Sequence, residues 1–148
     1  MRQIRSQQNW KSDRPYSSGV LAGGLAFLAG HVPVDATGQT AGRDAREQSA
    51  AVLANLDRTL AAGGMCRDDI VSTVVYLMDM ADIDALDDAY REFFGPSGPY
   101  PSRTTVQISS LGRSEFLVEV SAIAIAPAVA DAGTDTVADV ADVAAEPA

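Results

Sequence analysis

Residues 70 to 78 read IVSTVVYLM, and this apolar run decides the fold class. β-Branched side chains occupy both odd and even positions, a pattern typical of an inner strand that is covered on both faces of its sheet. An inner strand needs neighbouring strands to pair with and further elements to cover it. The sequence on either side should therefore supply helices and more strands.

Two helical patterns flank this strand. Residues 43 to 62 carry apolar and small side chains at spacings of three and four, which predicts an amphipathic helix that ends at a Gly-Gly pair. A second stripe runs through residues 83 to 94, before Gly95-Pro96 ends that helix. Its apolar members are Ile83, Leu86, Tyr90, Phe93 and Phe94. Each helix thus has one apolar face to place against a sheet.

The remaining segments predict strands and loops. Residues 17 to 29 form two short runs around Gly23-Gly24 and predict a hairpin, whereas turn-forming residues make 32 to 42 a loop. Residues 103 to 109 alternate like a half-covered strand, and residues 116 to 126 predict a final strand. The order is ββαβαββ, an α+β sandwich in which two helices cover one face of a mixed sheet.

The other face of that sheet would stay apolar. The strands hold more apolar side chains than two helices can cover, so we expect the chain to form an oligomer. The strand residues concerned are Val71, Val75, Leu77, Val106, Ile123 and Ile125. A hairpin between the last two strands, turning near Gly112, would place Arg103 opposite a residue near Ile123.

Length and charge restrict the classes of function. The 148 residues suit one domain, which we expect to span residues 1 to 127 and to begin with a polar arm. Residues 128 to 148 hold five acidic and no basic side chains, and this composition predicts a disordered tail. Without these five acidic residues the net charge of −9 becomes −4. The acidic balance and the scattered basic residues argue against nucleic acid as a partner.

Other classes are excluded by what the sequence lacks. No apolar run follows the N-terminus as in a signal peptide, and no segment has the length of a membrane helix. We therefore expect a cytoplasmic protein without a membrane partner. Cys66 is the only cysteine and His31 the only histidine, so we expect neither a cysteine-rich nor a histidine-rich metal site.

Four polar residues could carry chemistry, and each has a structural alternative. Glu119 lies in the middle of the apolar run LVEVSAIAIA, either as a buried acid or as an outward residue of an edge strand. Arg103 could hold a carboxylate or form a surface salt bridge. Tyr16 could contact a ligand or pack against the protein. His31 could transfer protons or be a hydrogen-bonded loop residue.

Several motifs follow one another in a familiar order. They are RPYSSGV at 14–20, LAGHVPVDATGQT at 28–40, VSTVVYLMD at 71–79, AYREFF at 89–94 and PSRTTVQISSL at 101–111. Over about residues 10 to 127 the chain resembles the RidA/YjgF family of reactive intermediate deaminases. The resemblance implies a chorismate-mutase-like fold, a homotrimer with clefts between its subunits, and hydrolysis of enamines or imines to ketones and ammonia without a cofactor.

The resemblance also implies roles for single residues. Arg103 matches the arginine that binds the substrate carboxylate, and Glu119 matches the acid that positions water and moves protons. Tyr16 matches a tyrosine that lines the cleft, and Gly30 lies where the family presents its main chain to the ligand. This chain departs from the family at Ala29, where a substrate-binding hydroxyl is usual.

Two further departures concern charge and polarity. His31 could replace the missing polar group, since an imidazole suits proton transfer. Asp87 stands where an asparagine is common, and it would add negative charge near an anionic ligand if it faces the cleft.

The resemblance leaves alternative functions open. The chain could hydrolyse small carboxylate-bearing imines such as 2-aminoacrylate, or act on a bulkier biosynthetic or catabolic imine. It could also bind small carboxylates without turning them over. Some members of the family carry an endoribonuclease label, but the acidic balance of this chain argues against RNA.

Overall fold

The computed structural model describes residues 1–127 of the chain, so the predicted acidic tail lies outside the described residues. The elements follow one another as β1 (Arg2–Ile4), β2 (Gly19–Ala22), β3 (Leu25–His31), α1 (Ala45–Ala62), η1 (Arg67–Asp69), β4 (Ile70–Leu77), η2 (Met80–Asp82), α2 (Ile83–Phe94), β5 (Ser102–Gln107) and β6 (Val118–Ile125). From β2 onward the strands and α-helices have the predicted order ββαβαββ. No helix of residues 1–127 has both the length and the apolar character to span a bilayer.

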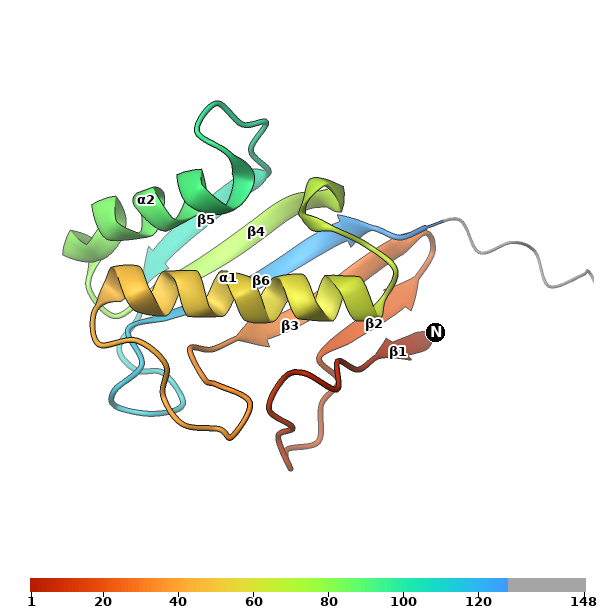
Figure 1. Cartoon of the computed structure of the whole chain (residues 1–148), viewed down its shortest axis with the longest axis horizontal. Coiled ribbons are helices and arrows are strands. Elements are labelled where there is room, and N and C mark those ends of the chain that lie inside the picture. Colours follow the sequence, from red (N-terminus) through yellow and green to blue (C-terminus); the bar gives the residue numbers. More distant parts are fainter. Residues whose placement is uncertain (128–148) are drawn as a thin grey trace, which may run out of the picture.

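The strands form one mixed sheet of six in the order β1-β2-β3-β6-β4-β5 (Figure 1). Only β4 and β5 run parallel, because α2 connects them as a crossover; the other neighbouring pairs are antiparallel. The predicted hairpin between the last two strands is therefore wrong. Arg103 pairs in register with Thr73 of β4, not with a residue near Ile123.

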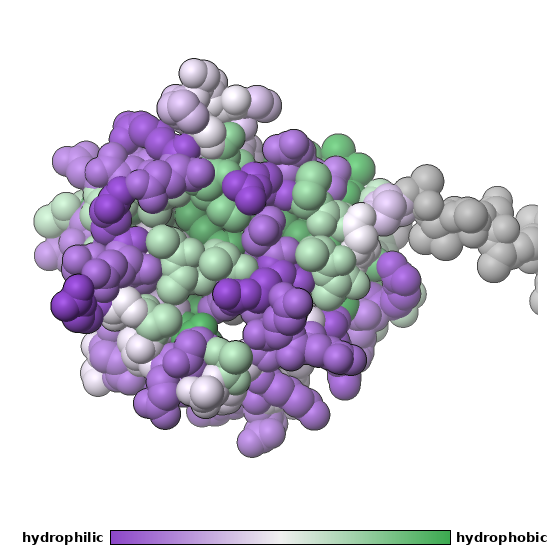
Figure 2. Space-filling view, in the orientation of Figure 1, coloured by the Kyte–Doolittle hydropathy of each residue, from purple (hydrophilic) through white to green (hydrophobic). Residues whose placement is uncertain are grey.

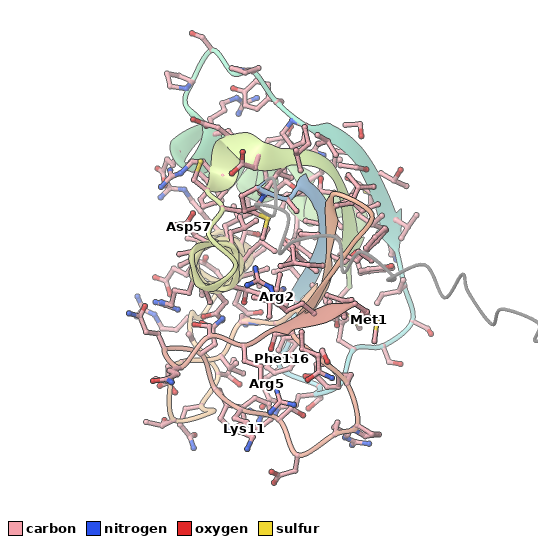
Figure 3. The ribbon with its side chains drawn as sticks, turned by 90° about the vertical axis from the view of Figure 1, so that its right-hand side faces the viewer. Met1, Arg2, Arg5, Lys11, Asp57 and Phe116 are labelled. Atoms are coloured by element: carbon pink, nitrogen blue, oxygen red, sulfur yellow. The ribbon has the colours of Figure 1, made fainter. Side chains whose placement is uncertain are left out.

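Both helices lie on one side of the sheet, which Figure 3 shows with α1 seen along its axis. Their apolar faces and the facing strand residues form a single core. The largest side chains in it that are almost fully buried include Leu53, Leu56, Leu60, Leu77 and Leu86. The fold class predicted from the sequence, α+β with two helices on a mixed sheet, is confirmed. The outward surface of this helical layer is largely hydrophilic (Figure 2).

The opposite face of the sheet has no covering element among residues 1–127, and it is partly apolar. Phe27 is 46% exposed, Ile125 is 54% exposed, and Val71 and Val106 are also exposed. Exposed apolar groups grouped in this way mark interaction surfaces. β4 is thus covered by helices on one face only, whereas the sequence predicts cover on both.

The N-terminal arm is more ordered than its polar sequence predicts. β1 pairs antiparallel with β2 at the edge of the sheet, and Ile4 is only 2% exposed within the core. Farther along the arm, the Asn9 side chain donates hydrogen bonds to the Asn55 carbonyl and to the Thr59 hydroxyl of α1. Isolated apolar and amide side chains therefore anchor a segment that has no periodic pattern.

Candidate functional site

Glu119 lies on the uncovered face of the sheet. Its neighbours in β6, Val118 and Val120, are fully buried beneath the helices, so the alternation of the strand turns Glu119 the other way. The pairing of β3 with β6 is irregular between Leu28 and His31, which is typical of a bulge. Gly30 lies inside this irregular stretch.

Gly30 leaves the space that the Glu119 carboxylate occupies. A Cβ atom on residue 30 would come within 1.9 Å of Glu119 Oε1, far closer than any real contact. Glu119 is half-buried, and desolvation raises the pKa of its carboxyl above its ordinary value. A partly desolvated carboxylate of this kind is suited to accept a proton from water.

Three other predicted site residues lie with Gly30 around a small cavity of about 40 Å³. Its lining includes Tyr16, Ala29, Gly30 and His31 together with Asn9, Trp10 and Asn55. The last three were missed by sequence reasoning. A signal for Asn55 does exist, because it is a polar residue on the buried stripe of α1, where it donates to the carbonyls of Val32 and Val34.

His31 is buried between β3 and α1, and both ring nitrogens are engaged. Nδ1 lies 2.8 Å from the Ala29 carbonyl oxygen and must donate to it, so in the neutral ring Nε2 accepts from the Thr59 hydroxyl. Burial lowers the pKa of His31 to about 4, although the hydrogen bond to Ala29 opposes part of this shift. The ring is therefore neutral at pH 7. This placement favours the structural alternative over a role in proton transfer.

Arg103 belongs to a second cavity, of about 270 Å³, whose lining includes Asp87, Tyr90, Arg91, Tyr100 and Pro101. Its guanidinium carbon lies 4.9 Å from the centre of the Tyr90 ring, and its Nη1 lies 2.7 Å from Asp87 Oδ1. The Tyr90 hydroxyl donates to Thr73, which fixes the ring beneath the guanidinium. Stacking and the ion pair hold Arg103 against α2, in reach of a ligand in the cavity.

Within one chain Arg103 and Glu119 do not meet. Thr73 pairs with Arg103, and Tyr76 pairs with Glu119, so the two positions are an odd number of residues apart along β4. Side chains at such positions point to opposite faces. Arg103 lies on the helical side at the edge of the sheet, and Glu119 lies on the uncovered side.

Comparison with known proteins decides the family. The model of the family described as Endoribonuclease L-PSP matches residues 6–126. A RutC family protein of Pyrococcus horikoshii is 38% identical over 111 residues, which are 74% of this chain and 86% of that protein. The chain belongs to the RidA/YjgF family. The recognition made from the sequence motifs is thereby confirmed.

Solved members of the RidA/YjgF family share the fold. The crystal structure of Escherichia coli TdcF with bound serine has a TM-score of 0.79 and 29% identity, and it covers 86% of this chain and 100% of TdcF. The Escherichia coli YjgF gene product has a TM-score of 0.79 at 28% identity, covering 84% and 98% of the two chains. In a sequence comparison TdcF is 30% identical over 75% of this chain and 86% of its own length, and its name describes a reactive intermediate deaminase.

In this RidA/YjgF protein the candidate site residues form two groups that are separate within one chain. One is centred on Gly30, which lies against Glu119 and lines the small cavity with Tyr16 and Ala29. The other comprises Arg103 and Asp87. Among residues 1–127 no three His, Cys, Asp or Glu side chains converge as metal ligands would. The charged side chains of the two groups are the carboxylates of Glu119 and Asp87 and the guanidinium of Arg103.

Proposed function

We propose that the protein hydrolyses enamines and imines that carry a carboxylate, releasing a keto acid and ammonia, with Glu119 and Arg103 as the catalytic residues. The observation that carries the proposal is the partly desolvated Glu119 carboxylate, which faces outward on the open side of the sheet against a residue without a side chain. Burying a carboxyl without a charged partner lowers stability, and such groups concentrate at functional sites.

The proposed reaction needs few groups. An enamine first tautomerises to the imine, whose carbon is electrophilic. A water molecule attacks this carbon and forms the C–O bond, while Glu119 accepts a proton from the water and passes it to the imine nitrogen. As the C–N bond of the carbinolamine breaks, Glu119 takes the proton of the hydroxyl, which becomes the carbonyl of the keto acid, and gives that proton to the departing ammonia.

Arg103 would orient the substrate through its carboxylate. Two N–H groups of a guanidinium can hold both carboxylate oxygens, which fixes the position of the reacting carbon. Fixing the reactants in a productive geometry can lower the barrier by several kcal/mol.

A second copy of the chain would bring the two groups of residues together. The uncovered face carries both Glu119 and exposed apolar side chains, and Arg103 lies on the edge strand β5. We therefore propose a homotrimer in which Arg103 and Asp87 of one copy face Tyr16, Gly30 and Glu119 of the next. Neither a metal nor an organic cofactor is part of this proposal, and RNA is not the proposed substrate.

A bulkier imine is the second candidate substrate. The cavity beside Arg103 measures about 270 Å³, and the rings of Tyr90 and Tyr100 contribute to its walls. Ala29 leaves additional room beside Gly30, because its side chain is a single methyl group. These features leave room in the site for a larger substituent on the carboxylate-bearing imine.

The test of the proposed function is ammonia release from 2-aminoacrylate generated in the assay by a second enzyme. We expect the protein to produce ammonia and pyruvate faster than the uncatalysed reaction, in proportion to its concentration. A larger, preformed carboxylated imine tests the second candidate in the same assay. If the protein binds carboxylates but accelerates the hydrolysis of none of these imines, it is a non-catalytic binder and not an enzyme.

A further inference from the structure

Asp87 forms an ion pair with one nitrogen of the Arg103 guanidinium, the group that is proposed to bind the substrate. Its Oδ1 lies 2.7 Å from Arg103 Nη1, and the two side chains are 29% and 24% exposed. The other carboxylate oxygen, Oδ2, lies 4.0 Å from Arg91 Nη2, so Asp87 stands between two arginines of the same cavity. Arg91 in turn lies 3.0 Å from Asp88. The four charges of this cluster sum to zero.

The other walls of the cavity offer little to compensate a ligand charge. The hydroxyl of Tyr90 donates to Thr73, and that of Tyr100 donates to the carbonyl of Gly95. Both hydroxyl protons are therefore engaged within the protein, and Pro101 adds an apolar side chain. Recognition of a charged group in this cavity depends on the arginines and on Asp87.

We propose that Asp87 determines the charge selectivity of this site, by compensating Arg103 internally so that the preference for anionic over neutral imines is smaller than Arg103 alone would give. The inference rests on the proposed function, since it specifies which substrates that site prefers. A carboxylate that binds the free N–H groups of Arg103 arrives within a few ångströms of the Asp87 carboxylate, and like charges at that distance repel. A neutral imine of the same shape escapes this repulsion.

The test compares Asp87→Asn with the parent protein, using binding of pyruvate and of its neutral amide. The asparagine keeps the size of the side chain and removes its charge. We expect Asp87→Asn to bind pyruvate about tenfold more tightly, the change that one nearby unit charge produces in a partly exposed site. Binding of pyruvamide should change by less than about twofold, because this neutral ligand carries no charge for the Asp87 carboxylate to repel.

Asp88→Asn is the matched control, because it removes the same charge from the adjacent residue. Asp88 pairs with Arg91 and makes no contact with Arg103 among the hydrogen bonds and ion pairs of residues 1–127. Its effect on pyruvate should stay within about twofold, as for an exposed pair. Weaker pyruvate binding in Asp87→Asn would show that Asp87 positions Arg103 rather than competing for it, and would overturn the proposal. Equal affinity of Asp87→Asn and Asp88→Asn for pyruvate, or no binding of pyruvate by either variant, would also overturn it.

Turnover separates this inference from the proposed function. If Asp87→Asn binds pyruvate more tightly while no variant hydrolyses an imine, the charge selectivity stands and the enzymatic proposal fails. If imines are hydrolysed but Asp87→Asn and Asp88→Asn do not differ, the enzymatic proposal stands and the inference about Asp87 is wrong. With both correct, Asp87→Asn raises kcat/KM for a carboxylated imine about tenfold and leaves a neutral imine nearly unchanged.

Discussion

Replacing Arg103 with alanine is expected to lower kcat/KM for a carboxylated imine by about two to three orders of magnitude, comparable to the loss of a key charge-stabilising donor. The reason is that a carboxylate would lose its two-point partner, and the reacting carbon would no longer be held in place. Arg103→Lys should restore only part of the rate, because an ammonium group cannot reproduce the planar fork of the guanidinium.

The fold should tolerate this change. Arg103 is partly exposed at the edge strand, and losing its ion pair with Asp87 and its stacking on Tyr90 should lower stability by about 1–2 kcal/mol. Thermal unfolding of Arg103→Ala should therefore stay cooperative at a somewhat lower temperature, whereas Arg46→Ala, which removes an equal charge from the exposed pair with Glu92, should unfold like the parent. If Arg103→Ala keeps the parent's kcat/KM, Arg103 does not bind the substrate.

Replacing Glu119 with glutamine is expected to leave carboxylate binding nearly intact and to lower kcat by about two to four orders of magnitude, the contribution of a positioned proton acceptor. The amide fills the same space against Gly30 but cannot accept a proton from water. Steady-state kinetics together with pyruvate binding separate the two effects. A variant that loses binding as well as rate would show that Glu119 holds the ligand.

The raised pKa of Glu119 gives this variant a second signature, in stability. A carboxyl whose pKa is higher in the folded chain than in the unfolded chain binds more protons when folded, so the free energy of unfolding falls as pH rises between those two values. Glu119→Gln removes this pH-dependent decrease in the free energy of unfolding, so the variant should be at least as stable as the parent at pH 7. The parent's kcat should fall as the pH drops through the folded pKa, because the base becomes protonated.

The order of elements was predictable because it depends on local patterns. The run at residues 70–78 and the stripes of α1 and α2 specify strand and helix whatever their partners are. The partners themselves were not predictable from these patterns. The assignment of β5 as the parallel neighbour of β4 follows from the α2 crossover, and the alternation within β5 is equally compatible with a hairpin.

The site was predictable only as a set of residue types. The charge of Glu119 within an apolar strand marks it as unusual, and the register of the sheet decides that it faces away from Arg103. Arg103 and Asp87 are distant in sequence, so their ion pair could not be foreseen. His31 shows the converse, since a residue that suits proton transfer by type is buried with both nitrogens engaged.

The central claim is that imines are hydrolysed at a site built from Arg103 of one copy and Glu119 of another. It is tested most directly by mixing subunits of Arg103→Ala and Glu119→Gln, each of which is expected to keep at most about a hundredth of the parent's activity alone. Light scattering should first show that both variants and the parent have about three times the chain mass of 15.5 kDa. Equal amounts are then co-expressed or refolded together.

In such a mixture a site has an intact Arg103 in half of the cases and, independently, an intact Glu119 in half, so about a quarter of the parent's ammonia release should return. The control mixes the parent with the double variant. It should also give about a quarter if sites are shared, and about half if each site lies within one chain. Recovery of about a quarter in both mixtures is the result that we predict. No recovery in the mixture of single variants, with about half in the control, would contradict the shared site.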